Sequence, residues 1–238
     1  MKRSLNVLKY LLVFAFIVFL YSFTSQRNKA RAIAKIDIEF VDESLPFLSL
    51  DTVNKLLIQS QNNSTSINKE KLDLNEMEIR LRKNPMIRNA QVYLSIDGVL
   101  GAKIEQRSPI ARVAGSPGFY LDEDGMKMPL SGMYSARVPL ISGKSNLNLE
   151  KVTELFTKIN RDPFMKNSVV GIHVLEDDAI LLQLRKQEFT IHLGKIERVE
   201  KKFQNYKAFY QKSKQDSTLS DYKQVNLEYL SQVVATKL

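Results

Sequence analysis

The sequence contains no cysteine, and it has only two histidines and nine glycines among 238 residues. The absence of cysteine excludes disulfides, thiolate nucleophiles and cysteine-based metal sites. Two histidines without a third ligand do not make a zinc site, and so few glycines leave little for a phosphate-binding loop. No nucleophile elbow or paired-carboxylate motif is present. We therefore predict a protein that is not an enzyme, with no catalytic, cofactor-binding or metal-binding residues and no small-molecule substrate.

The two histidines follow the alternation of predicted strands. His173 lies between Ile172 and Val174, and His192 lies between Ile191 and Leu193. A strand alternates its side chains between two faces, so both histidines are predicted to lie exposed on the face opposite the core.

Acidic residues are absent from the N-terminal end of the chain, and this absence accounts for most of the net charge of +9. Residues 1–35 contain seven Lys or Arg and no acid, and the remainder contains 28 basic against 26 acidic residues. The positive charge therefore belongs to a short terminal region, where anionic lipid head groups would attract it. Since no basic stripe with interleaved aromatic residues accompanies it, we predict no nucleic-acid partner.

No charged residue occurs between positions 10 and 26, where apolar and aromatic residues dominate. The run approaches the roughly 20 residues that a helix needs to cross a bilayer, so residues 10–26 are predicted to be a transmembrane helix. Residues 1–9 are predicted to be a cytoplasmic tail, because they are too few to form a domain. Basic residues flank both ends, so charge alone does not decide the orientation.

A cleaved signal peptide is the competing interpretation of this run. Ala32-Ile33-Ala34 is a small-x-small triplet of the kind that precedes a cleavage site. However, three basic residues lie between the apolar run and the triplet, which is unusual before a cleavage site. The pattern favours an uncleaved anchor.

Residues 35–106 carry the signals of a small β-α-α-β-β domain. A strand is predicted over 36–41, then a helix that Ser49 caps, with Val53, Leu56 and Leu57 on its buried side. A polar loop follows over 59–71, and a second helix begins at Asp73. Glu76 is placed to complete a capping box by reaching back to the helix start.

A hairpin is predicted after Pro85, which stops the second helix. Ala90, Val92, Leu94 and Ile96 share one face of the outgoing strand, and Leu100, Ala102 and Ile104 resume the alternation on the return strand. Asp97-Gly98 between them is typical of a two-residue turn in which both residues take positive φ.

The remaining residues, 107–238, are predicted to form a mostly antiparallel β domain with flanking helices. Asn148 is predicted to cap one helix, three strands follow over 169–193, and a basic helix covers 195–214 with its lysines on a solvated face. Residues 122–125, Asp-Glu-Asp-Gly, are read as a surface turn, because a calcium loop needs more widely spaced oxygen ligands. The whole chain is thus predicted to be α+β.

Short motifs in a fixed order give this chain a resemblance to the bacterial cell-division family FtsQ/DivIB. They are Asn84-Pro85-Met86-Ile87, Gln106-Arg107-Ser108-Pro109-Ile110-Ala111, Tyr120-Leu121-Asp122 before Gly125, residues 138–143, and Gln232-Val233-Val234. In that family a POTRA domain precedes a C-terminal β domain. Gln106 stands where the family pattern has Glu, so an ion pair that the family's Glu could form is not expected at Gln106. Glu228 stands where the family pattern has Arg.

The resemblance implies a single-pass protein of the inner membrane, with a periplasmic bulk, that accumulates at the division septum. It implies a divisome scaffold that links early and late septal proteins and binds partners resembling FtsL and FtsB through the C-terminal domain. Half-polar alternation near the end predicts a sheet edge that pairs with a partner strand. The predicted partner-binding residues of this edge strand are Asn226, Leu227, Tyr229, Gln232, Val233 and Val234.

Two other functions remain open at this point. POTRA domains also occur in protein-assembly and secretion factors, although those usually precede a transmembrane barrel that needs more residues than this chain offers. A membrane-anchored hydrolase is the third interpretation, because catalytic groups converge in space and need not form a sequence motif.

Overall fold

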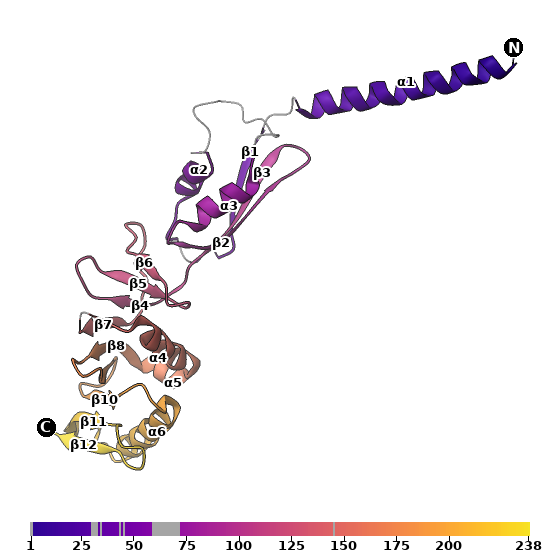
Figure 1. The fold of residues 1–238 in the computed structure, drawn as a ribbon. Helices are drawn as coiled ribbons and strands as arrows, with labels where there is room; N and C mark the ends of the chain where they lie inside the picture. Colours follow the sequence, from indigo (N-terminus) through magenta and orange to yellow (C-terminus); the bar gives the residue numbers. More distant parts are fainter. Residues whose placement is uncertain are drawn as a thin grey trace. The chain divides into compact units, whose positions relative to one another are not determined.

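A computed structural model describes residues 2–29, 33, 35–42, 44, 46–58, 72–144 and 146–238, with side chains outside 2–8 and 27–29. The chain divides into two compact units, Met1–Gln106 and Arg107–Leu238. Both combine helices with a sheet (Figure 1), which confirms the predicted α+β class. The predicted loop over 59–71 and the alanines of the cleavage-like triplet lie outside the described residues.

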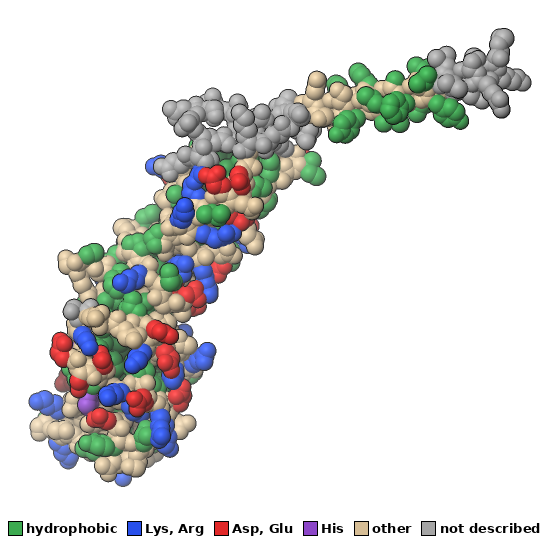
Figure 2. All heavy atoms as spheres, in the orientation of Figure 1, with side chains coloured by type: hydrophobic (Ala, Val, Ile, Leu, Met, Phe, Trp, Pro, Cys, Tyr) green, Lys and Arg blue, Asp and Glu red, His purple; other side chains and the backbone are tan. Residues whose placement is uncertain are grey.

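The first helix, α1 (Lys2–Lys29), contains the apolar run. Its segment Lys9–Gln26 is long and apolar enough to cross a membrane, and none of that segment is buried within the structure. Hydrophobic side chains lie along this helix in the space-filling view (Figure 2). The helix therefore offers an apolar surface that the described residues leave uncovered.

The rest of the first unit has the predicted β-α-α-β-β order. It runs through β1 (Lys35–Phe40), α2 (Leu50–Ile58), α3 (Leu74–Arg82), β2 (Ile87–Leu94) and β3 (Val99–Gln106). β3 is the central strand, parallel to β1 and antiparallel to β2. The two helices bury their apolar faces against this sheet, and the core residues are Val53, Leu57, Met77, Leu81, Ile87, Ala90, Val92, Leu100, Ala102 and Ile104.

Both predicted helix caps are present in the first unit. The Ser49 hydroxyl accepts from the Thr52 amide at 3.1 Å, and the Asp73 carboxylate accepts from the Glu76 amide at 2.9 Å. The predicted reach-back of Glu76 is wrong, because its carboxylate instead accepts from the Arg80 guanidinium at 2.7 Å. An (i, i+4) ion pair on the helix surface has replaced the second half of the capping box.

The β2–β3 turn differs from the predicted two-residue turn. Gly98 has a positive φ of 89°, whereas Asp97 does not, and the Gly98 amide donates to the Ser95 carbonyl. A type I turn followed by a left-handed glycine closes a three-residue hairpin loop. Ile96 therefore lies in the loop and is 84% exposed, so its predicted place on the core face is wrong.

The C-terminal unit is built on a nine-stranded sheet in the order β12-β11-β10-β9-β8-β7-β4-β5-β6. Five of the pairings among the described strands are antiparallel and three are parallel. The strands are β4 (Pro109–Val113), β5 (Phe119–Asp122), β6 (Lys127–Pro129), β7 (Leu140–Gly143), β8 (Val169–Val174), β9 (Ile180–Leu184), β10 (Thr190–Gly194), β11 (Tyr222–Asn226) and β12 (Val234–Lys237).

Three helices lie together along one side of these strands (Figure 1): α4 (Leu149–Arg161), α5 (Pro163–Ser168) and α6 (Val199–Gln215). A short 3₁₀ helix, Leu219–Asp221, precedes β11. Asn148 caps α4 as predicted, accepting from the Lys151 amide. Sequence reasoning missed α5, which starts because Asp162 accepts from the Phe164 and Met165 amides and Pro163 occupies the first helical position.

A single apolar core joins the three helices to the strands. Large, fully buried side chains of this core come from both layers, including Phe156 on α4, Tyr206 on α6 and Leu121 on β5, with Phe189 just before β10. Burial raises the pKa of the Tyr206 hydroxyl. The sheet thus has one face covered by helices, and its strand order leaves β12 and β6 as its two edges.

Candidate partner-binding edge

The predicted continuous strand over residues 226–234 is not present. β11 ends at Asn226, the chain leaves the sheet, and β12 begins at Val234. β11 is an inner strand, because it pairs in parallel with β10 on one side and antiparallel with β12 on the other. The edge of the sheet is therefore β12, and Val234 is the member of the predicted set that belongs to it.

The other predicted residues occupy the segment that joins the two strands. Leu227 is fully buried and its amide donates to the His192 carbonyl at 2.9 Å, so its side chain packs in the core of its own unit. Asn226 accepts from the Glu228 amide, which turns the chain away from β11. The role of this set in partner binding stays a prediction, but the set does not act as one strand.

Three members of the set, Tyr229, Gln232 and Val234, are exposed, and a fourth, Val233, is partly buried. Tyr229 is 51% exposed and Val234 is 42% exposed, while Gln232 is exposed and Val233 is partly buried against the core. Tyr229 and Val234 give the surface next to β12 an apolar character. Tyrosine is enriched among the residues that carry binding energy at protein interfaces, so Tyr229 is the stronger candidate anchor of the two.

The backbone of β12 has two residues whose polar groups point away from the sheet. The Leu238 amide donates inward to the Asp221 carbonyl at 2.9 Å. Successive residues of an antiparallel strand alternate between inward and outward hydrogen bonding, so Val234 and Thr236 face β11, and Ala235 and Lys237 present their N–H and C=O groups outward. Sequence analysis did not predict Ala235 and Lys237. The alternation of apolar and polar residues shows which face a side chain lies on, but it does not show which strand forms the edge of the sheet.

Side chains of α6 hold the segment before β12 in place. The Asn205 amide group donates to the Leu230 carbonyl at 3.1 Å. Lys202 donates from Nζ to the Leu193 and Lys195 carbonyls, each at 2.8 Å, and thereby fixes the turn that follows β10. The Glu228 side chain lies against Gly194 in that same turn.

Lys202 corrects the prediction that the α6 lysines form a solvated face. Its side chain is only 4% exposed, and the resulting loss of hydration lowers the pKa of its ammonium. The hydrogen-bond partners of its ammonium are neutral carbonyls, so Lys202 acts as a buried donor that joins α6 to the turn after β10.

The other sheet edges are less suited to strand pairing. β6 is three residues long and ends in Pro129, which lacks an N–H. β1 alternates Lys35, Asp37 and Glu39 with its apolar residues, and such charges discourage strand addition.

At β2, two side chains of α3 occupy backbone groups directly. The Glu78 carboxylate accepts from the Val92 amide at 2.9 Å, and the Arg82 guanidinium donates to the Ala90 carbonyl at 3.1 Å. Glu78 and Arg82 also pair with each other at 2.6 Å. This edge is therefore closed by its own helix.

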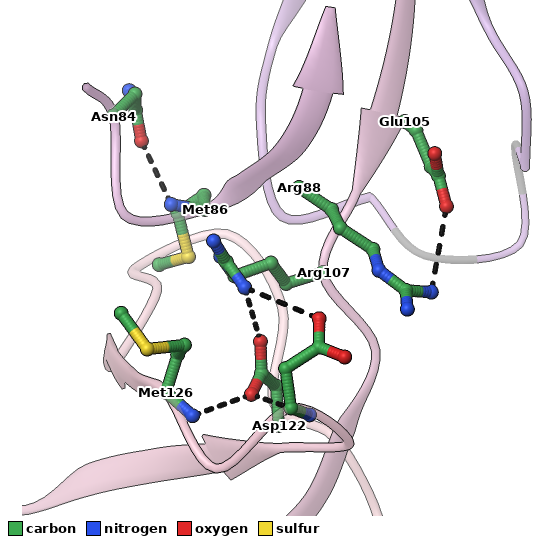
Figure 3. Close-up of polar contacts among 8 residues, drawn as sticks. Asn84, Met86, Arg88, Glu105, Arg107, Asp122 and Met126 are labelled. Atoms are coloured by element: carbon green, nitrogen blue, oxygen red, sulfur yellow. Dashed lines mark hydrogen bonds and ion pairs between the residues drawn. The ribbon is translucent and has the colours of Figure 1, made fainter. Parts of the chain in front are cut away.

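The Asp122–Gly125 turn is more than the predicted surface turn. Asp122 is 2% exposed and accepts from the Asp124 and Met126 amides, while the Arg107 guanidinium lies 2.6 Å from its second carboxylate oxygen (Figure 3). Gly125 has a positive φ of 75°. An ion pair missed by sequence reasoning thus joins the first residue of this unit to its first hairpin.

Figure 3 also shows the Arg88–Glu105 pair of the first unit, whose atoms lie 3.5 Å apart across β2 and β3. The neighbouring Gln106 is buried and accepts from the Leu48 amide at 3.0 Å. The neutral amide at this position therefore bonds to the chain preceding α2.

The two histidines lie on the face opposite the helices, as alternation predicts, but they are half-buried and not fully exposed. The His173 Nδ1 atom lies 3.0 Å from the Ser142 hydroxyl on the neighbouring strand. Within the part of the chain that the structure describes, no cluster of three or more His, Asp or Glu side chains is placed to hold a metal ion.

The fold and this edge define an α+β protein with an N-terminal helix fit to span a membrane and a helix-backed sheet that ends in an open strand. A model of the family "FtsQ/DivIB, C-terminal related" matches residues 108–236, nearly the whole C-terminal unit and more than half of the chain. The chain therefore belongs to the FtsQ/DivIB C-terminal-related family of cell-division proteins. A search of curated proteins found no match.

Proposed function

We propose that this protein is a non-enzymatic, membrane-anchored scaffold of the bacterial divisome. In this proposal α1 is an uncleaved anchor with a cytoplasmic N-terminus, and the POTRA-like domain of residues 35–106 and the C-terminal unit lie in the periplasm. The scaffold links early and late septal proteins, and its partners resemble FtsL and FtsB. Anchoring confines the scaffold and its partners to one membrane plane, which raises their effective concentration.

The open edge of β12 is the observation that carries this proposal. Outward N–H and C=O groups at Ala235 and Lys237 are suited to an added strand, and Tyr229 and Val234 supply apolar contacts beside it. Family membership supports a role in cell division, and the apolar α1 supports attachment to the membrane.

A fluorescent fusion followed through the cell cycle, combined with depletion, tests the cellular role. We expect a midcell band and, after depletion, filaments without septa. Uniform membrane signal with normal septa would contradict the proposal.

Ala235→Pro tests the edge itself, because proline removes an outward N–H while the inward bonds of Thr236 and Leu238 remain. We expect binding of the FtsL- and FtsB-like partners to weaken by about tenfold or more, since one bond is lost and the ring obstructs the incoming strand. Co-purification from membranes with the full-length chain measures the loss, and circular dichroism checks the fold.

Lys127→Pro is the matched control at the other edge of the same sheet. The Asp122 amide donates to the Met126 carbonyl, so alternation places the Lys127 N–H outward on β6 as well. This variant should bind partners normally. Equal losses in the two variants, or no loss in Ala235→Pro, would show that β12 is not the docking strand.

A further inference from the structure

A cavity of about 590 Å³ lies in the C-terminal unit and shares no lining residue with β11 or β12. Its volume is within the roughly 300–1,000 Å³ of typical ligand sites. The buried part of its lining is apolar and includes Ile110 on β4, Ile159 on α4 and Val169 on β8. This cavity is therefore separate from the β12 edge that carries the proposed function.

Three exposed cations from separate segments border the same cavity: Arg137 before β7, Lys166 on α5 and Arg185 after β9. Glu123 is the acid among the lining residues. The lining thus carries a net positive charge next to an apolar surface.

These cations differ from others in the same unit. Lys144 pairs with Asp178, Lys158 with Glu154 and Glu200, and Lys207 with Asp162. Among the described residues, the three cations at the cavity have no ion-pair partner and no side-chain hydrogen bond. Their charge remains available for a ligand.

We propose that this cavity is a second docking site, which binds an acidic segment of a partner protein. Carboxylates of the segment pair with Arg137, Lys166 and Arg185, and arginine suits this role because its planar donors match a carboxylate. Apolar side chains between the carboxylates pack on Ile110, Ile159 and Val169. A small anion would leave that apolar surface uncovered, so the combined lining favours a peptide.

The test uses the full chain in micelles of a neutral detergent and a fluorescent peptide of alternating glutamate and valine. A peptide with glutamine in place of glutamate is the probe control. We expect fluorescence anisotropy to show binding of the glutamate peptide alone, and this binding should weaken at high salt because surface charges are screened.

The double variant Arg137→Ala, Arg185→Ala should weaken peptide binding by about twofold to thirtyfold, the range expected for two exposed ion pairs. Its thermal unfolding should match the parent, because both side chains are exposed. The matched control is Lys212→Ala, Lys214→Ala, which removes two exposed charges from α6. The control variant should bind the peptide normally, and so should Ala235→Pro, which separates this site from β12.

Four outcomes would overturn the proposal. They are absence of peptide binding at low salt, equal binding of the glutamine peptide, equal losses in the cavity and α6 variants, and displacement of the peptide by millimolar inorganic phosphate. The last result would identify a simple anion site.

Discussion

The two units use charged side chains in opposite ways. In the first unit, Glu78 and Arg82 extend from α3 to the outer edge of β2 and occupy its backbone groups. In the C-terminal unit, Asp122 and Lys202 are buried and Arg107 is partly buried, and no side chain of the described residues hydrogen-bonds to the backbone of the β12 edge. In the first unit, charged side chains therefore block further strand pairing at β2. In the C-terminal unit, charged side chains stabilise the interior, and the β12 edge can accept a strand. The comparison predicts that charge removal affects the two units differently.

The largest effect is expected for Arg107→Ala. This change leaves the buried Asp122 carboxylate with its two amide donors but no cation, and breaking a buried ion pair typically costs about 3–5 kcal/mol. We expect the free energy of unfolding of the C-terminal unit to fall by about 3 kcal/mol in chemical denaturation. Arg112→Ala, which truncates an exposed arginine on β4, should change it by less than about 0.5 kcal/mol. Equally small losses of stability in Arg107→Ala and Arg112→Ala would show that the Arg107–Asp122 pair does not stabilise the C-terminal unit.

Lys202→Met should have the next largest effect. Methionine keeps the length of the side chain but leaves the Leu193 and Lys195 carbonyls without this donor, and an unsatisfied buried group costs about 1–3 kcal/mol. Hydrogen exchange should increase in the turn after β10 and in the segment 227–233. Lys201→Met, at an exposed neighbouring position, is the control and should leave both regions protected.

Removing the side chains that cover the β2 edge should lower the free energy of unfolding moderately and should also cause association between chains. The double variant Glu78→Ala, Arg82→Ala frees the Val92 amide and the Ala90 carbonyl, and we expect a loss of about 1–2 kcal/mol. Exposed strand groups also promote pairing between chains, so sedimentation should show concentration-dependent association. Glu76→Ala, Arg80→Ala removes the other (i, i+4) pair of α3 and should not cause association. Association in both variants would mean that β2 is not specifically protected.

The smallest effect concerns pH and Asp162. Burial acts to raise the pKa of this carboxyl, but the Lys207 ammonium and the Met165 and Phe164 amides lower it overall. Its stabilisation is therefore present above the unfolded pKa of about 3.9 and is lost as the pH falls through the lower folded value.

Asp162→Asn keeps the helix cap and removes the ion pair, so it should cost less than about 1 kcal/mol near neutral pH. The difference between parent and variant should shrink as the pH falls below the unfolded pKa of about 3.9 and disappear once Asp162 is protonated in the folded state, as followed by denaturant unfolding across this range. A constant difference would show that the ion pair contributes nothing to acid sensitivity.

Hydrophobic periodicity was sufficient to predict the elements that bury one face. The strands around Val92, Ile172 and Ile191 and the Asn148-capped helix were predicted because each places apolar residues at the spacing of its own geometry. Short elements with little periodicity, such as α5 and β6, were missed.

The candidate site was less predictable, because its features depend on contacts between distant residues. The sequence around Val225, Leu227 and Tyr229 alternates as one strand would, yet the Asn226 side chain turns the chain and separates β11 from β12. The burial of Lys202 and the Arg107–Asp122 pair arise from packing, and a lysine-rich helix and an acidic turn give no sign of either.

The parallel pairing of β10 with β11 has a consequence for assembly in the cell. Two parallel neighbouring strands require a long crossover, here supplied by the segment that contains α6, so β11 must pair with β10 across a wide separation in sequence. β12 in turn depends on β11 for its inner hydrogen bonds. Under the proposed role of β12, a chain in which β11 has not yet paired with β10 lacks the ordered edge to which a partner strand would add.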